Sequence, residues 1–173
     1  MQFYTVTINK MNTSLETERL LLSPLSFDNA EFIYELLNTP GWIEFIGDRN
    51  IKSIEDAQKY ILKILDDSNL TYWVVNLKES LTTIGIVTFI KRNYLEHCDI
   101  GFAFLPQYEK NGYAFEATAA VLKELNKNSS YSNILATTIP ENKNSIRLLE
   151  KLGLKYQKEI TVEKEKLLIY SMG

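Results

Sequence analysis

Two polar segments of the sequence combine residue types that could bind a phosphorylated ligand and act on it. The first, Leu105–Ala117, contains Asn111, Gly112 and Glu116 and is typical of a strand end, a tight loop and a helix start. The second, Asn142–Leu154, is a short amphipathic stretch that also opens with hydrogen-bonding side chains. Backbone N–H groups at a helix start lack partners within the helix and attract phosphate. Two such starts beside strand ends would suit a long phosphorylated cofactor. The alternative for the first segment is an ordinary strand-to-helix loop.

Other catalytic and metal-binding patterns are missing from the sequence. It has neither the glycine spacing of dinucleotide folds and P-loops nor a G-x-S-x-G nucleophile motif. His97 is the single histidine and Cys98 the single cysteine. Neighbouring strand residues point to opposite faces, so these two cannot form a catalytic pair. We expect no metal site, and we interpret His97 as a surface residue and Cys98 as a small core residue.

Composition favours one soluble domain that spans residues 1–173, with residues 1–12 as an extra N-terminal segment. Hydrophobic residues make up 45% of the 173 residues and charged residues 24%, which is enough apolar material for a core. A net charge of −3 does not suggest a nucleic-acid partner. No stretch has transmembrane length and no internal disulfide can form, so we expect no membrane partner and a cytoplasmic location.

Apolar periodicity predicts the elements that must position the two polar segments. Helices are expected at 27–38, from Ser53 onward, at 112–126 with Phe115, Ala119 and Leu122 on one stripe, and at 142–152. Strands are expected at 17–24, 71–77, 82–90, 98–105, 134–139, 154–161 and 166–172. Thr39–Gly41 is interpreted as a turn. This order predicts a mixed α/β fold, with a mostly antiparallel sheet, one parallel βαβ unit and helices on both faces.

The chemistry-bearing segments also resemble a known family. The run Pro106–Ala117 resembles motif A of the GNAT superfamily of acyl-CoA N-acyltransferases, and Pro140–Leu154 resembles its motif B. Asp99–Phe102 is similar to the strand before motif A, and Leu15–Leu22 is similar to the family's opening strand. The likeness covers nearly the whole chain from about Leu15, and it is strongest to the ribosomal-protein alanine N-acetyltransferase branch.

The resemblance implies acetyl-CoA as donor, an amine as acceptor, and a cofactor wedge between two parallel strands that splay apart. Backbone groups of the strand would pair with the pantetheine arm, and the turn would bind the diphosphate. The implied cofactor residues are Phe102, Ala103, Phe104, Leu105, Lys110, Asn111, Gly112, Tyr113, Ala114, Phe115, Asn142 and Ser145. Glu109 and Lys110 depart from the family pattern. A glutamate near a diphosphate is unfavourable unless it points away, and Lys110 can compensate.

Acyl transfer from a thioester to an amine needs a neutral amine, a donor to the carbonyl oxygen and a stabilised thiolate. We expect the donor to be a backbone N–H near Phe104. Leu149 stands where many relatives carry a tyrosine acid, so that acid is excluded. The resemblance implies that Ser145 assists the sulfur and that Asn142 positions the donor. The alternative for Ser145 is a helix cap.

Strand alternation places Asp99 on a small-residue face with Gly101 and Ala103, where a carboxylate could accept a proton through water. The alternative is a solvated strand-end aspartate, and Glu163 is an outside candidate for the base. The acceptor side is expected on the loop around the first helices. Its candidate residues are Trp42, Phe45, Asp48 and Arg49, which could instead pack and cap.

The resulting hypothesis is an N-acetyltransferase that works by direct attack in a ternary complex. The acceptor is a protein N-terminus or, alternatively, a small-molecule amine such as an amino sugar, polyamine or drug. A non-catalytic CoA sensor is the alternative from another class. Homodimer formation stays open. Residues 1–12 are interpreted as an added edge strand or the product of an upstream start.

Overall fold

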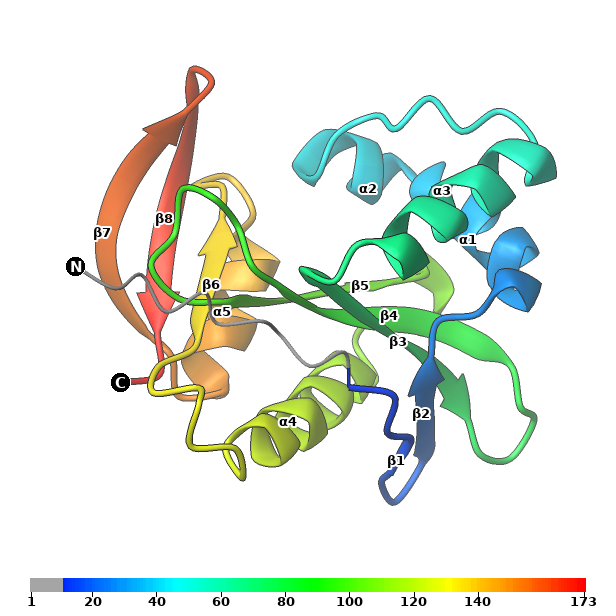
Figure 1. The fold of residues 1–173 in the computed structure, drawn as a ribbon, viewed down its shortest axis with the longest axis horizontal. Coiled ribbons are helices and arrows are strands. Elements are labelled where there is room, and N and C mark those ends of the chain that lie inside the picture. Colours follow the sequence, from blue (N-terminus) through cyan, green and yellow to red (C-terminus); the bar gives the residue numbers. More distant parts are fainter. Residues whose placement is uncertain (1–10) are drawn as a thin grey trace.

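One twisted sheet, seen in Figure 1, organises residues 11–173, the part of the chain that the computed structural model describes. The strands are β1 (Leu15–Glu16), β2 (Leu20–Pro24), β3 (Leu70–Leu77), β4 (Thr83–Ile90), β5 (Asp99–Phe104), β6 (Leu135–Thr138), β7 (Lys155–Val162) and β8 (Glu165–Ser171). The α-helices are α1 (Ala30–Leu37), α2 (Pro40–Phe45), α3 (Ile54–Asp66), α4 (Tyr113–Leu125) and α5 (Lys143–Lys151). Two 3-10 turns, η1 (Phe27–Asn29) and η2 (Pro106–Tyr108), precede α1 and the α4 loop.

The sheet is antiparallel except at one junction near its middle. Its strand order is β1-β2-β3-β4-β5-β6-β8-β7, and only β5 and β6 run parallel within the described chain. These two strands share a single register position, Asp99 opposite Leu135, and then diverge (Figure 1). The predicted mixed α/β fold with a splayed parallel pair is confirmed.

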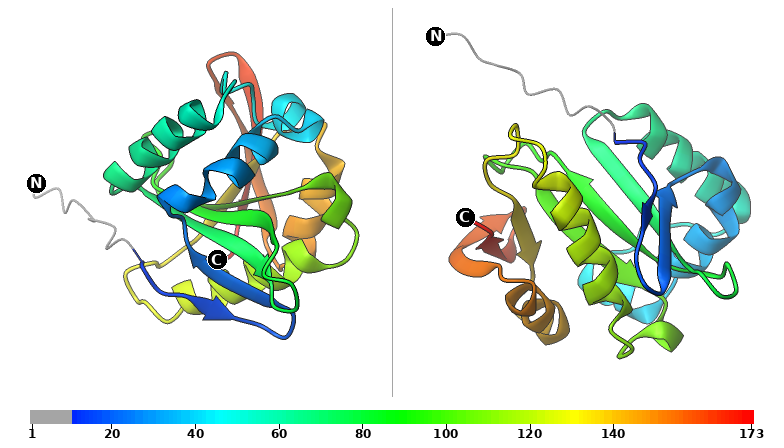
Figure 2. Two further views of the ribbon diagram at one scale, coloured as in Figure 1. Left: turned by 90° about the vertical axis from the view of Figure 1, so that its right-hand side faces the viewer. Right: turned by 90° about the horizontal axis from the view of Figure 1, so that it is seen from below.

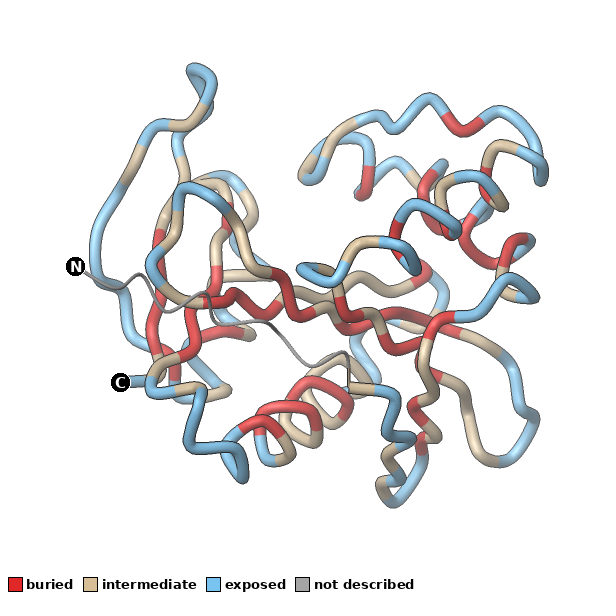
Figure 3. Tube along the Cα trace, in the orientation of Figure 1, coloured by how far each residue is buried: buried red, intermediate tan, exposed pale blue. Residues whose placement is uncertain are grey.

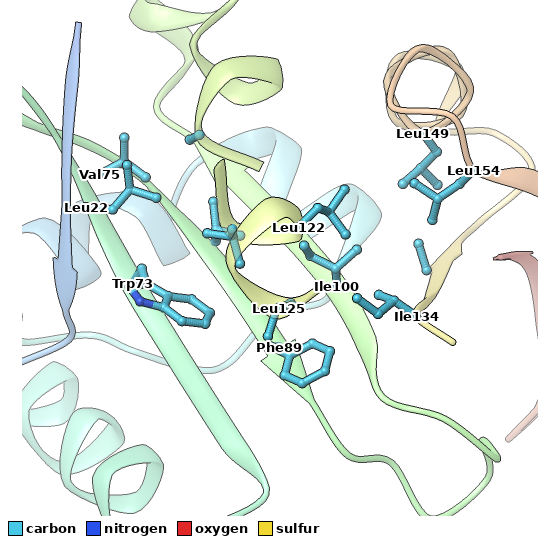
Figure 4. Close-up of a cluster of buried hydrophobic side chains, with 14 of the residues drawn as sticks. Leu22, Trp73, Val75, Phe89, Ile100, Leu122, Leu125, Ile134, Leu149 and Leu154 are labelled. Carbon is cyan, nitrogen blue, oxygen red and sulfur yellow. The ribbon is translucent and has the colours of Figure 1, made fainter. Parts of the chain in front are cut away.

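Helices cover both faces of the sheet, as predicted (Figure 2). Helices α4 and α5 pack on one face, where Leu122 and Leu125 meet Phe89 and Ile100 (Figure 4). Helices α1, α2 and α3 bury a second cluster on the other face. Figure 3 shows the buried segments along the central strands, while most of β7 is exposed. Strand β5 packs against a hydrophobic core on each face of the sheet. This packing keeps β5, which borders the wedge, in position.

One sequence interpretation is corrected, and another is refined. The segment Thr39–Gly41 starts a helix, because Thr39 accepts the N–H of Trp42 and proline is well tolerated at the first helical position. In α4 the buried stripe centres on Ala117, Val121 and Leu125. Phe115, Ala119 and Leu122 lie on one stripe, as predicted, because all three line the same hollow, but Phe115 and Ala119 are only half-buried.

None of the helices in residues 11–173 is long and apolar enough to cross a membrane. The predicted extra segment, residues 1–12, lies almost wholly outside the described residues.

Candidate active site

The wedge between β5 and β6 has a closed apex and an open mouth. At the apex the N–H of Leu135 donates to the carbonyl oxygen of Cys98 at 2.9 Å, beside the single register pair of the two strands. Beyond this point the strands separate toward their carboxyl ends. Ligands of α/β sheets commonly bind where neighbouring strands part, and the mouth here opens onto the starts of α4 and α5.

Strand β5 presents an unpaired backbone edge to this wedge. The N–H of Leu105 donates to the carbonyl oxygen of Ile84 in β4 at 2.9 Å. Because backbone groups alternate in direction along a strand, Leu105 and Ala103 bond toward β4, whereas Phe102 and Phe104 face the β6 side. Of the four strand residues predicted to bind the cofactor, only Phe102 and Phe104 have backbone groups that a ligand in the wedge could reach. Leu105 is buried in the core.

The turn before α4 has the backbone geometry of an anion cradle. Lys110 and Gly112 both have left-handed backbones, with φ of 63° and 81°. The first helical hydrogen bond runs from Glu116 N–H to Gly112 O at 3.0 Å. The amides of Tyr113–Phe115 therefore precede the helical ladder, and within the described chain no side chain caps them.

The other helix starts that follow a loop are closed by their own side chains. Thr39 caps α2, Ser53 caps α3 as predicted, and Asn142 caps α5. The Oδ1 of Asn142 accepts the N–H of Ser145 at 3.1 Å. The interpretation of Ser145 as the cap is thus wrong, because Ser145 is the third residue of α5. The second helix opens with a hydrogen-bonding side chain, as predicted, and because Asn142 caps it, the uncapped amides are those of α4.

An arginine that sequence reasoning missed holds this turn in place. The Nε of Arg19 donates to Glu116 Oε2 at 2.7 Å, and its Nη1 donates to the carbonyl oxygen of Asn111 at 3.0 Å. The guanidinium lies 4.5 Å from the centre of the Tyr113 ring. Thr17 Oγ1 and the N–H of Arg19 both donate to Glu116 Oε1, at 2.6 Å and 2.9 Å.

This network connects the segment before β2 to the turn before α4. Partial burial would raise the pKa of Glu116, but the hydrogen bonds from Thr17 and Arg19 outweigh it and lower the pKa. Glu116 therefore stays ionised, and Arg19 balances its charge. Both residues lie in segments that the sequence singled out, Arg19 in the opening strand and Glu116 in motif A. Their contact could not be predicted, because it depends on how the two segments pack in the fold.

Asp99 is buried rather than solvated. Its side chain is 4% exposed and accepts from Arg92 Nε at 2.9 Å, while its other oxygen lies 3.5 Å from Thr137 Oγ1. Burial raises the pKa of Asp99, and Arg92 opposes that rise. The solvated-aspartate alternative is wrong. If Asp99 accepted a proton, it would do so while one of its oxygens accepts a hydrogen bond from Arg92.

The predicted acceptor residues separate into packed and exposed groups. Trp42 is 6% exposed and packs in the core under α1–α3, and its Nε1 has no hydrogen-bond partner among residues 11–173. Phe45 is half-buried. Asp48 accepts the N–H of Asn50 at 2.7 Å, which closes a turn, and Arg49 is exposed. The packing alternative describes Trp42 and the turn alternative describes Asp48, while contact of Phe45 or Arg49 with an acceptor stays a prediction.

The remaining predicted residues fall outside the wedge or in the core. Leu149 is 1% exposed, Glu163 is exposed in the β7–β8 turn, and Glu109 is exposed in the loop before the cradle. Cys98 is buried, as predicted, and His97 is half-buried. Within residues 11–173, no three His, Cys, Asp or Glu residues are arranged to hold a metal ion.

A shallow hollow adjoins the outer side of the cradle. It has a volume of about 290 Å³, and Phe115, Ala119 and Lys123 of α4 line it together with Leu152. The Nζ of Lys151 lies 4.5 Å from the centre of the Phe115 ring. Apolar walls with lysines at the rim suit a flat ring that carries a phosphate.

The sequence matches a family model and a known relative. The family model described as an acetyltransferase (GNAT) domain matches residues 19–155. An uncharacterized N-acetyltransferase of Bacillus subtilis, YnaD, is 32% identical over 142 residues, which cover 82% of each chain.

Solved structures share the fold. An acetyltransferase of the GNAT family from Bacillus anthracis has a TM-score of 0.77 at 27% identity, over 92% of this chain and 97% of its own. A ribosomal-protein-S5-alanine acetyltransferase from Vibrio fischeri also has a TM-score of 0.77, at 20% identity, over 92% of this chain and 95% of its own.

Proposed function

The chain belongs to the GNAT family of acetyltransferases, whose acyl donor is acyl-CoA, and we propose that it transfers an acetyl group from acetyl-CoA to a primary amine. The amine attacks directly in a ternary complex. The observation that carries this proposal is the uncapped start of α4 at Tyr113–Phe115, which follows the carboxyl end of β5 where the strand wedge opens.

The turn and the strand would bind different parts of the donor. The free amides after Gly112 favour the diphosphate, because a helix start concentrates partial positive charge. A side chain at Gly112 would be strained at its φ of 81°, and its Cβ would lie 3.4 Å from Nη2 of Arg19, which holds this turn. The open backbone groups of Phe102 and Phe104 can pair with the amides of the pantetheine arm, as an added strand pairs with a sheet edge.

The nucleotide end of the donor would leave the wedge past Phe115. The hollow along α4 lies on that side and offers an apolar wall at Ala119 and positive charge at Lys123 and Lys151. We assign it to the adenosine part of the donor.

The acyl end would lie inside the wedge, between the start of α5 at its mouth and Asp99 at its apex. The pantetheine arm would run from the turn before α4 along β5, so that its thioester end points toward Asp99. The N–H of Phe102 or Phe104 would then donate to the carbonyl oxygen as negative charge develops there. Ser145 would donate to the departing sulfur from the start of α5, since its Oγ is not used for capping. Asn142 would contact the arm through the amide nitrogen that capping leaves available.

The acceptor would approach from the α1–α3 face, where Arg49, Arg92 and Asp99 lie. A protein N-terminus remains our prediction from the branch that the motifs resemble. A small-molecule amine is favoured by a specific observation, the charged Arg92–Asp99 pair at the apex, which suits a compact polar acceptor.

An acceptor panel tests the proposal. Purified protein is mixed with acetyl-CoA and peptides with free N-termini, amino sugars, polyamines or amino acids, and thiol release is followed. We expect release with one acceptor class and none without an amine. Stabilisation by CoA without thiol release from any amine would contradict turnover and support a CoA sensor.

A further inference from the structure

The ion pair at the wedge apex exposes its cation and hides its anion. The side chain of Arg92 is 34% exposed, while that of its partner Asp99 is 4% exposed. The Nε of Arg92 donates to Asp99 Oδ1 at 2.9 Å, and Thr137 lies at the second carboxylate oxygen. One edge of the guanidinium is therefore fixed by a buried carboxylate, and Arg92 also shares a hydrogen bond with the Tyr94 side chain. The exposed part of the guanidinium is what a second partner could contact.

A second arginine lies near this pair. Burial would lower the pKa of Arg92, but Asp99, Tyr94 and Tyr72 together raise it, so the guanidinium is charged. Burial raises the pKa of the Tyr72 phenol, and Arg92 and Arg49 both oppose that rise, which places both arginines near the same phenol. Two arginines therefore lie close to the enclosed carboxylate of Asp99.

The pair also lies where the substituent of an attacking amine would be. Asp99 opposes Leu135 at the only register position of β5 and β6 in the described chain, and Thr137 lies two residues further along β6. If the donor binds as under the proposed function, on which this step rests, the thioester lies inside the wedge and points toward this apex. An amine that attacks from the α1–α3 face then brings its neighbouring groups next to Arg92.

We propose that Arg92 binds an anionic group, a carboxylate or a phosphate, that a small-molecule acceptor carries close to its amine. A planar guanidinium held on one edge offers its terminal nitrogens as a fork that matches either anion. Asp99 is in this view a positioning residue that fixes the orientation of Arg92. The acceptor class is thus an amino acid or an amino-sugar phosphate, and a polyamine is disfavoured because it brings only positive charge.

The competing explanation is that Arg92 only neutralises a buried carboxylate. The two explanations differ when both charges are removed together. The double variant R92Q/D99N leaves no orphaned charge in the core, whereas Arg92→Gln alone strands Asp99 and can unfold the protein. Asp99→Asn alone keeps the cation. Lys59→Gln is the control, because Lys59 forms an ion pair with Glu55 on the exposed side of α3.

The experiment compares acceptors that differ only in the anion. Thiol release from acetyl-CoA is measured with phenylalanine against phenylalaninamide and with glucosamine 6-phosphate against glucosamine, with spermidine as the cationic acceptor. Rates are corrected for the neutral fraction of each amine. We expect kcat/KM to favour the anionic member of one pair by roughly tenfold to hundredfold, the effect of one charge-assisted contact. The pair that responds distinguishes carboxylate from phosphate.

The variants decide the role of Arg92. We expect D99N to keep the preference for the anionic member, because the asparagine oxygen can still accept from Arg92 Nε and hold its orientation. K59Q should also keep the preference, and R92Q/D99N should lose it. A preference that survives in R92Q/D99N, or a better rate with neutral amines, peptide N-termini or spermidine, overturns the proposal while leaving acetyl transfer intact. Calorimetric titration of the same amines into the CoA-bound protein provides a readout without turnover. Equal binding of anionic and neutral members there also overturns the proposal, even if no acceptor releases thiol.

Discussion

Replacing Arg19 by glutamine should weaken the binding of acetyl-CoA without changing the chemical step. The substitution removes the 3.0 Å hydrogen bond to the Asn111 carbonyl, which is worth about 1 kcal/mol. It also leaves Glu116 without its cation. Glu116 lies one helical turn beyond Gly112, so its carboxylate would be roughly 8 Å from a phosphate bound at the tip of the turn.

The second effect can be estimated from the same geometry. Two unit charges at about 8 Å repel by about 2 kcal/mol at an effective dielectric constant of about 20. Since the Arg19 side chain is 43% exposed, solvent screening reduces this to about 1 kcal/mol. Together the two losses give about 2 kcal/mol, or a roughly thirtyfold rise in the KM for acetyl-CoA. The kcat at saturating acetyl-CoA should be unchanged.

Steady-state kinetics with varied acetyl-CoA, and calorimetric titration of CoA, measure the two quantities separately. The double variant R19Q/E116Q should recover part of the lost affinity, because it removes the unpaired carboxylate. Lys59→Gln, at an exposed ion pair on α3, is the matched control and should leave KM unaltered. An unaltered KM in Arg19→Gln would refute the role of the network. Equal weakness of the single and double variants would refute the charge argument.

The remaining predictions concern the cradle, α5 and pH. Gly112→Glu should abolish CoA binding in calorimetric titration, because a carboxylate at a φ of 81° blocks the phosphate approach; retained affinity would refute the cradle. Ser145→Ala should lower kcat by roughly tenfold to a thousandfold with little change in melting temperature, and the reverse pattern would give the hydroxyl a structural role only. Asn142→Ala should lower the free energy of unfolding by about 1 kcal/mol through loss of the α5 cap, and denaturant titration that shows no loss would contradict the cap. The wild type should be more stable than Glu116→Gln at neutral pH. Because the folded-state pKa of Glu116 is lowered from its ordinary 4.5, this advantage is present above that value and is lost as pH falls through the folded pKa. An advantage that persists in acid unfolding below that range would show that the charge is not its source.

Local sequence rules predicted most of the fold because the relevant interactions are short-range. Alternation predicted which face of β5 carries Asp99, and the capping pattern predicted the start of α3 at Ser53. Where the same local pattern fits two structures, the prediction went wrong. Thr39 and Pro40 suit a turn or a capped helix start, and only the packing of Trp42 in the core selects the helix.

The candidate site was predicted less completely because its key contacts join distant segments. Arg19 and Glu116 are 97 residues apart in the chain, so no local pattern pairs them. The partner of Asp99 is only seven residues away, but Arg92 reaches it across the connection from β4 to β5. Either Asn142 or Ser145 could have capped α5 by residue type, and the position at which the helix begins decided between them.

A crystal structure of the protein with acetyl-CoA would test the central claim most directly. The account predicts that the diphosphate accepts hydrogen bonds from the amides of Tyr113–Phe115. It also predicts that the pantetheine arm lies between β5 and β6, pairs with Phe102 or Phe104, and places its sulfur within reach of Ser145. A coenzyme bound elsewhere, with the α4 start and the β5 edge left without contact to it, would contradict the account.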